Sequence, residues 1–213
     1  MNLKTIKTVW SEKDLKQNTY IIEEDEGCII IDAGAPLSEV LKETDKEIVA
    51  VFITHGHFDH INYIEEYDKL NIPIYCHKLT AEFLTNPVYN ASSLWDSVIF
   101  KVNNLKFVED GDEISVLNKT IKCFSTSGHS SDGMCYLYDN KDLFSGDTLF
   151  SIAIGRTDLE TANTQEMIES LLKIDNIPYV NLYAGHGRAS TKEEQSKKLN
   201  YWINLLKGKE IEQ

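Results

Sequence analysis

The chain has 213 residues, 42% of them hydrophobic and 26% charged, without low-complexity stretches, which excludes a disordered or fibrous protein. Its 34 acidic and 21 basic residues give a formal net charge of −13, which argues against nucleic acid and anionic membrane surfaces as partners. No segment has the apolar length of a signal peptide or a transmembrane helix, so we expect a cytoplasmic protein.

Segments rich in β-branched and aromatic residues alternate with turn signals in the first third of the chain. They predict strands over 5–10, 18–24, 28–34 and 47–55. Pro36 at a first-turn position, followed by Leu37, Val40 and Leu41 on one face, predicts a helix over 35–46. Another helix is predicted over 61–70.

Short strands recur in the middle of the chain, and two amphipathic helices follow them. The strands are predicted over 97–103, 113–126, 134–140 and 142–146, with turns at Gly111-Asp112, Asn118-Lys119 and Asn140-Lys141. The helices are predicted over 163–174, with Asn163 as the N-cap, and over 190–207.

Neither a linker-like segment nor an internal repeat interrupts this pattern, which predicts a single domain over 1–213. Antiparallel-looking strands broken by single helices predict an α/β or α+β fold with helices packed outside sheets. The four cysteines are widely spaced and form no C-x-x-C pair; they are Cys28, Cys76, Cys123 and Cys135. We expect buried small hydrophobes in a reducing compartment, and neither disulfides nor zinc ligands.

Residues 53–60 read Ile-Thr-His-Gly-His-Phe-Asp-His and follow a strand that looks buried. A loop in this place lies at the carboxyl end of a sheet, where ligand sites gather. Three imidazoles in one loop would repel each other if protonated, and a shared cation is the simplest reason for keeping them together. Gly56 lets the loop turn tightly enough for His55 and His57 to face one point.

Three more strand ends offer metal-binding side chains. His129 and His186 each follow a glycine after a strand-like run, and Asp147 stands in a Ser-Gly-Asp turn, where the alternative is a plain turn residue. With Asp59 and His60, the chain offers five histidines and two aspartates, enough for two metal ions with positions left for water and substrate. His77 lacks this context, so we expect it to be structural or exposed.

This ordered set resembles the metallo-β-lactamase superfamily, whose H-x-H-x-D-H motif is here His55-Gly-His57-Phe-Asp59-His60. The resemblance extends to the segments Ile31–Gly34, Gly128-His129, Gly146-Asp147 and 185–187. It implies an αββα four-layer sandwich with the site at one edge.

The resemblance also implies a ligand set. The first metal site would consist of His55, His57 and His129, the second of Asp59, His60 and His186, and Asp147 would bridge them. Asp32 would hydrogen-bond a ligand histidine, or else be a strand-end turn residue. Two divalent ions are implied, with zinc expected and iron or manganese as alternatives.

Gly155-Arg156-Thr157-Asp158 resembles a segment of glyoxalase II-type thioester hydrolases, which act on hydroxyacylglutathione, and of related persulfide dioxygenases. A two-metal site implies hydrolysis of a small-molecule thioester, with a metal-bridging hydroxide as nucleophile. Asp59 is expected to be a ligand that could also shuttle a proton. Arg156 is a candidate for binding an anionic substrate, and an ion pair with Asp158 is its alternative.

Three departures and three alternatives stay open. The family's Gly-His-Thr-Pro-Gly is Gly-His-Ser-Ser-Asp-Gly at 128–133 here, and Ala184 and Arg188 stand where prolines are common, which changes loop stiffness. Residues after 207 do not form the basic helical region that grips glutathione in glyoxalase II, so we do not expect glutathione specificity. The alternatives are a one-iron persulfide dioxygenase using His55, His129 and Asp147, a lactone or lactam hydrolase, and a non-enzymatic binding protein. Oligomeric state is not predicted.

Overall fold

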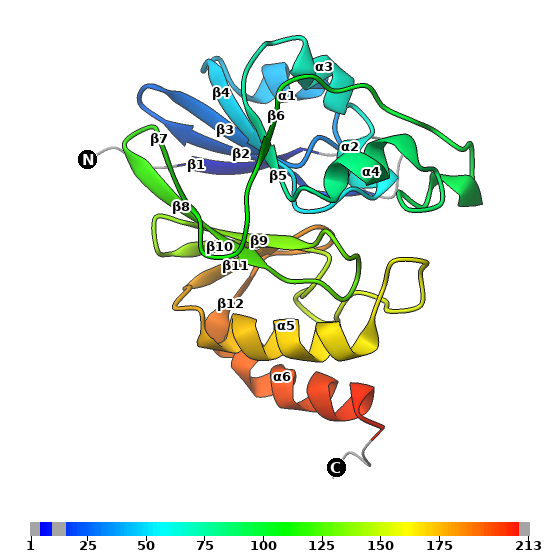
Figure 1. The fold of residues 1–213 in the computed structure, drawn as a ribbon. Coiled ribbons are helices and arrows are strands. Elements are labelled where there is room, and N and C mark those ends of the chain that lie inside the picture. Colours follow the sequence, from blue (N-terminus) through cyan, green and yellow to red (C-terminus); the bar gives the residue numbers. More distant parts are fainter. Residues whose placement is uncertain (1–4, 10–15, 209–213) are drawn as a thin grey trace.

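Two six-stranded β-sheets face each other in this computed structural model, which describes residues 5–9 and 16–208 (Figure 1). The first sheet has the order β1 (Thr5–Val9), β2 (Thr19–Glu24), β3 (Gly27–Ile31), β4 (Ile48–Phe52), β5 (Ile74–Cys76) and β6 (Leu105–Phe107). The second has the order β12 (Ser190–Thr191), β11 (Asn181–Ala184), β10 (Asp142–Gly146), β9 (Met134–Tyr138), β8 (Lys119–Ser125) and β7 (Glu113–Val116).

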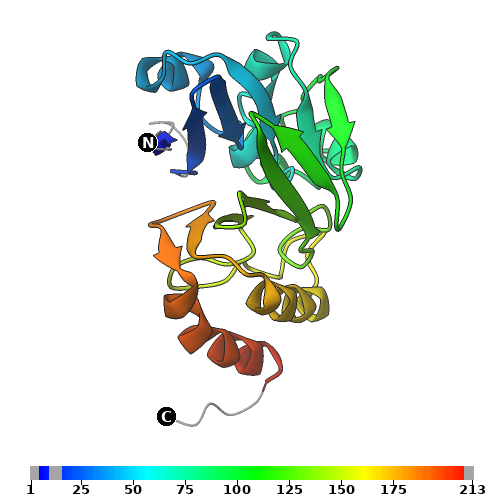
Figure 2. The ribbon, with the colours of Figure 1, turned by 90° about the vertical axis from the view of Figure 1, so that its left-hand side faces the viewer.

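Helices cover the outer face of each sheet, as Figures 1 and 2 show. Those beside the first sheet are α1 (Leu37–Glu43), α2 (Phe58–Ile61), α3 (Ile64–Asp68) and α4 (Thr80–Thr85), with a 3-10 turn over Ser92–Leu94. The second sheet is covered by α5 (Thr164–Asn176) and α6 (Lys192–Leu206). The predicted αββα sandwich is therefore confirmed. No helix in the described ranges is long and apolar enough to cross a bilayer.

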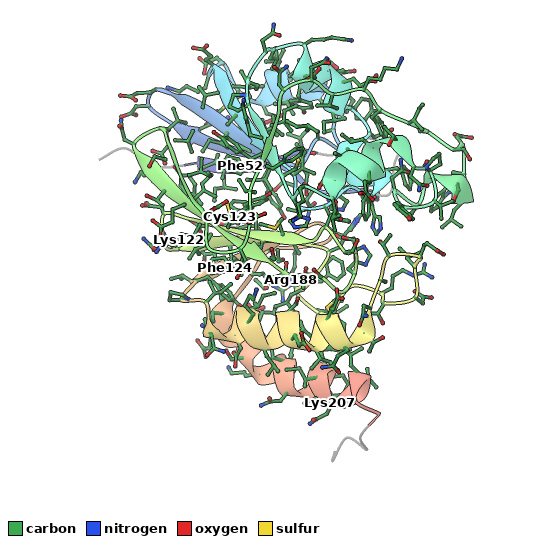
Figure 3. All side chains as sticks on the ribbon, viewed as in Figure 1. Phe52, Lys122, Cys123, Phe124, Arg188 and Lys207 are labelled. Carbon is green, nitrogen blue, oxygen red and sulfur yellow. The ribbon has the colours of Figure 1, made fainter. Side chains whose placement is uncertain are left out.

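Alternating side chains on the strands explain the four layers. In β3, Ile30 packs toward α1 and α3, whereas Ile29 and Ile31 pack between the sheets. Phe52 and Cys123, labelled in Figure 3, meet in the same middle layer. Because successive side chains of a strand point to opposite faces, a strand apolar on both faces needs a cover on each side. A third buried apolar cluster packs α5 and α6 against the second sheet.

Parallel pairing places several strand ends at one edge of the sandwich. β3 pairs with β4 in parallel with Ile31 opposite Phe52, and β10 pairs with β11 in parallel with Gly146 opposite Ala184. Backbone hydrogen bonds then join the two sheets at this edge, for example from Asn18 N to Gly185 O at 2.7 Å. Loops that leave these four strands consequently converge.

The predicted elements agree with the structure except in a few segments. Asn163 caps α5 by accepting hydrogen bonds from Gln165 N and Glu166 N, and all four cysteines are free and buried, both as predicted. The turn predicted at 118–119 lies one position earlier in the structure. Leu117 and Asn118, with φ of 49° and 58°, join β7 and β8. The predicted turn at 140–141 lies within the turn over residues 139–141 that joins β9 and β10, and the one at 111–112 connects the two sheets.

The strand predicted over 97–103 is wrong, and β5, β6, β12 and α4 had no predicted counterpart. Val98 and Phe100 do pack into the core, but their backbone groups bind elsewhere. Asn90 Nδ2 donates to Val98 O at 3.0 Å, and Phe100 N donates to Leu84 O at 2.7 Å. The apolar alternation is therefore real, while the backbone partners that define a strand are absent over the described residues 97–103. The single helix predicted over 61–70 is split between α2 and α3.

Candidate metal centre

Seven side chains from four segments that follow strands meet at the edge where the strand ends converge. Four follow β4, one lies between β8 and β9, one follows β10 and one follows β11. Their ligand atoms form three groups, within each of which all atoms lie within 4.8 Å of one another: His55, His57 and His129; His55, His60 and Asp147; and Asp59, His60 and His186. All seven residues expected from the sequence are thus brought together, while His77 lies outside these groups.

Glycines make room for this crowding at two positions. A Cβ on Gly185 would lie 2.1 Å from Asp147 Oδ1 and 2.6 Å from His60 Cε1. A Cβ on Gly56 would lie 2.5 Å from the Cβ of Phe83. At both positions it is the close approach of neighbouring side chains that excludes any larger residue.

Several buried polar atoms in the cluster have no protein partner in the described part of the chain. Nε2 of His55 and Nε2 of His57 make no hydrogen bond, and Nε2 of His60 faces Asp147 Oδ1 at 3.2 Å outside hydrogen-bond geometry. An unsatisfied buried polar atom costs about 1–3 kcal/mol. A divalent cation would satisfy Nε2 of His55 and Nε2 of His60, whereas in His57 it is Nδ1 that faces another ligand nitrogen. Imidazole and carboxylate ligands suit zinc and other first-row metals.

Hydrogen bonds to the other ring nitrogens orient these imidazoles. His60 Nδ1 lies 2.7 Å from Asp32 Oδ2, and His129 Nδ1 lies 3.0 Å from the carbonyl oxygen of Arg156. A carbonyl only accepts, so His129 carries its proton on Nδ1 and leaves Nε2 as a free lone pair. That Nε2 faces His57 Nδ1 at 3.0 Å, which is the arrangement expected of two nitrogens that share a cation.

Asp32 holds part of the cluster in place through hydrogen bonds to Thr54 and His60. Its backbone is left-handed, with φ of 63°, and the residue is only 1% exposed. Oδ1 accepts from Thr54 N at 2.7 Å, and Oδ2 accepts from Thr54 Oγ1 at 2.9 Å besides contacting His60. The carboxylate therefore fixes both the ring of His60 and the start of the loop that carries His55 and His57.

The protonation states of His55, His57 and Asp147 already suit metal binding. Burial, reinforced by the neighbouring His129, lowers the pKa of His57 to about 3, and burial with the neighbouring His60 places the pKa of His55 well below its ordinary value. Burial raises the pKa of Asp147, but the charge of His60 outweighs burial and holds that pKa well below its usual range. Neutral imidazoles and ionised carboxylates are the forms that bind metals.

Burial lowers the pKa values of His60 and His186, but neighbouring carboxylates outweigh burial, raising the pKa of His60 well above its ordinary value and that of His186 to about 9. Metal binding would therefore release protons from these two side chains.

Arg156 has two separate roles in the structure. Its guanidinium forms a bidentate ion pair with Asp158, with Nε to Oδ1 at 2.6 Å and Nη2 to Oδ2 at 2.8 Å, and both side chains are exposed. The pair is the alternative that the sequence left open. The backbone carbonyl oxygen of Arg156, by contrast, accepts the hydrogen bond that orients His129.

Asp132 is a buried residue of the site that the sequence prediction did not single out. Its Oδ2 accepts from Gly56 N at 2.8 Å and from Thr80 Oγ1 at 2.8 Å. The sequence showed only that the segment 128–133, which contains Asp132, departs from the family motif. Burial raises the pKa of Asp132 to about 6, although hydrogen bonds from the Thr80 hydroxyl and Gly56 N oppose the shift.

This raised pKa predicts a pH-dependent stability difference between the wild type and Asp132→Asn, both freed of metal. Between pH 4 and 6 the folded state holds the Asp132 proton while the unfolded chain releases it, so the wild type loses stability as pH rises. Relative to Asp132→Asn, we expect a loss of about 3 kcal/mol, complete near pH 7. Urea unfolding at pH 4, 5.5, 7 and 8 measures it, and a pH-independent difference would contradict it.

The comparison with known proteins identifies the family to which this edge-of-sandwich cluster belongs. The model of the metallo-beta-lactamase superfamily matches residues 13–186. The chain belongs to this superfamily. As a member with the complete set of His and Asp side chains in place, it is a metal-dependent hydrolase.

Relatives of this superfamily member include two hydrolases with different names and one solved structure. It is 31% identical over 175 residues to the probable polyketide biosynthesis zinc-dependent hydrolase PksB of Bacillus subtilis, covering 78% of this chain and 71% of the relative. It is 33% identical over 199 residues to the hydroxyacylglutathione hydrolase of Wigglesworthia glossinidia brevipalpis, covering 90% and 68%. The crystal structure of the BLEG-1 B3 metallo-beta-lactamase superposes with a TM-score of 0.83 at 28% identity, covering 93% and 99%.

A cavity of about 250 Å³ lies beside the cluster. Phe83 forms part of its wall and also contacts His57, with ring centroids 6.2 Å apart. Ser131, two residues after His129, lines it as well. Of the described residues that line this cavity, two carry charge, and both are glutamates, Glu82 and Glu160.

Proposed function

We propose that this protein hydrolyses a thioester, with two divalent ions held by the seven clustered side chains. His55, His57 and His129 would hold one ion, Asp59, His60 and His186 the other, and Asp147 would reach both. The observation that carries the proposal is the convergence of unpartnered buried nitrogens and carboxylate oxygens in three overlapping groups. Zinc is the proposed metal, in line with the name of the PksB relative.

The protein side chains position the reacting groups. Asp147 lies in the middle of the cluster, with Oδ2 3.4 Å from His186 Nε2 and 3.6 Å from His129 Nε2. Asp59 Oδ2 lies 3.2 Å from His186 Nε2, and the charge of His60 holds the pKa of Asp59 below its ordinary value despite burial. This favours Asp59 as a carboxylate ligand that can receive a proton only transiently. Bound ions would polarise the substrate carbonyl and lower the pKa of water.

A thioester is favoured over a lactam or lactone by two considerations. The chain is similar to a hydroxyacylglutathione hydrolase over 90% of its length. A thiol with a pKa near 8.5 also leaves as the thiolate without help from a strong general acid, whereas an amine leaving group needs a proton.

The charge of the adjoining cavity bears on the thiol carrier. Glu82 and Glu160 line it, and the guanidinium of Arg156 is already paired with Asp158. Carboxylates in a substrate placed there would meet like charge, so we propose a thiol without carboxylates rather than glutathione.

Two measurements on the purified protein test this function. Metal analysis is expected to find two divalent ions per chain, and a panel of thioesters that includes S-lactoylglutathione should show at least one that is hydrolysed without oxygen consumption. One iron per chain together with oxygen consumption on a persulfide would instead support the dioxygenase alternative and overturn the hydrolase proposal.

The charge of the thiol carrier is expected to respond to Glu82→Gln/Glu160→Gln. The substrates are acetylthiocholine, neutral S-acetyl-N-acetylcysteamine and anionic S-acetyl-3-mercaptopropionate. Removal of two exposed negative charges should raise kcat/KM for the anionic thioester up to about fivefold and lower it for the cationic one, leaving the neutral one unchanged. Glu39→Gln/Glu193→Gln on α1 and α6 is the matched control. Equal effects on all three substrates would contradict charge selection.

A further inference from the structure

The proposed metal site is divided between the two sheets. His55 and His57 follow β4 of the first sheet, whereas His129 lies in the loop that leads into β9 of the second. The three-histidine group therefore keeps its geometry only if these two loops keep their positions relative to each other. Coordination distances of about 2 Å leave little tolerance for a shift between them.

Two hydrogen bonds hold the loops together. One is between backbone groups, from Met134 N to Thr54 O at 2.7 Å. The other ends on a side chain, because Gly56 N donates to Asp132 Oδ2 at 2.8 Å. Gly56 stands between His55 and His57, so this second bond fixes the peptide unit that links two proposed ligands.

A third element, α4, also holds Asp132 in place. The Thr80 hydroxyl at the start of α4 donates to the same oxygen at 2.8 Å, and both residues are fully buried. The carboxylate thus joins the loop after β4, the loop before β9 and α4. No ring nitrogen of a proposed ligand contacts it, so any influence on the metal acts through the backbone.

We propose that Asp132 is a positioning residue that sets the separation of the His55–His57 loop from His129 and thereby the affinity of the three-histidine site for a divalent ion. The inference rests on the proposed metal site. It assigns to a side-chain tether the rigidity that a proline supplies in the family pattern, where this chain has Ser131.

The competing explanation is that Asp132 only stabilises the fold. Metal binding separates the two roles, because a purely stabilising residue can be lost without changing the affinity of the molecules that stay folded. Titration with Co²⁺, followed by its visible absorption, and competition for Zn²⁺ with a chelator measure that affinity directly. Thermal unfolding of the metal-free proteins measures stability alongside.

Asp132→Ala should weaken the tighter Co²⁺ site about 10- to 100-fold, the usual effect of losing a group that orients a ligand. Asp132→Asn keeps a side-chain oxygen for Gly56 N and should stay within about threefold of the wild type. Thr80→Val leaves the Gly56 bond in place and should weaken binding by an intermediate factor of about three to ten. If Asp132→Ala does not fold, Thr80→Val decides the question.

Asp68 offers a matched control far from the proposed ligands. It is a buried carboxylate whose Oδ1 accepts from Asn103 N at 3.0 Å and Asn104 N at 2.9 Å. Asp68→Ala should lower the melting temperature without changing Co²⁺ affinity. Equal weakening by Asp68→Ala and Asp132→Ala, or wild-type affinity in both Asp132→Ala and Thr80→Val, would overturn the inference. A wild type that bound no metal would instead count against the proposed function.

Discussion

Replacement of Asp147 by alanine is expected to abolish thioester hydrolysis, with a loss of at least about 1,000-fold in kcat, or about 4 kcal/mol of transition-state stabilisation. Its two carboxylate oxygens lie between 3.2 and 3.6 Å from ring nitrogens of His60, His129 and His186. Its removal also leaves three imidazoles facing one another without the intervening negative charge.

Metal stoichiometry and activity should therefore fall together in Asp147→Ala. We expect fewer than two tightly bound ions per chain by elemental analysis after dialysis, with an unchanged far-ultraviolet circular dichroism spectrum. Asp110→Ala is a suitable control, because Asp110 is an exposed carboxylate paired with Lys173. Wild-type activity in Asp147→Ala would refute the proposed catalytic site altogether.

Replacement of Asp32 by alanine should damage both the site and the fold. The change leaves His60 Nδ1 and Thr54 N without their partner, each at about 1–3 kcal/mol in a buried setting. The left-handed backbone at Asp32 adds about 1 kcal/mol, because alanine tolerates a φ of 63° poorly. We expect a total destabilisation of about 3–5 kcal/mol and metal affinity lowered about 10- to 100-fold.

A short series of variants separates these contributions at Asp32. Asp32→Gly loses the same hydrogen bonds but relieves the backbone, and it should be more stable than Asp32→Ala by about 1 kcal/mol. Asp32→Asn tolerates the left-handed conformation and keeps an acceptor for Thr54 N, so it should lie closest to the wild type. Urea unfolding of the metal-free proteins ranks them. An alanine variant as stable as the asparagine variant would rule out the anchoring role described for this residue.

The proposed ligands could be found in the sequence because metal chemistry restricts residue types. Few reasons other than a cation bring His55, His57 and His60 into one loop, and strand-end positions then pointed to His129 and Asp147. The pattern of strands and helices predicted only an α/β or α+β fold with helices outside sheets, and the four-layer sandwich was implied by the resemblance to the metallo-β-lactamase superfamily. The motif residues lie in short segments of the chain, so the sequence displays them directly.

Asp132 and the segment 97–103 show what local reasoning misses. The partner of Asp132 is Gly56, and their contact exists only because two sheets pack with one particular offset. Val98 and Phe100 do have the apolar side chains of a strand, yet Asn90 and Leu84 occupy their backbone groups. Each outcome depends on partners distant in the sequence, which periodicity cannot reveal. β5 was missed because three residues are too few to establish a period.

The division of the cluster between two sheets has a consequence for unfolding. An ion held by His55 and His129, or by His60 and His186, would act as a reversible cross-link between segments far apart in the chain. Unlike a disulfide, which stays closed in the unfolded chain, the ion would bind only the assembled protein, so it would stabilise the folded state according to its affinity and concentration. A chelator should therefore do more than stop turnover. It removes the bound ion that makes the two halves of the sandwich unfold as one cooperative unit.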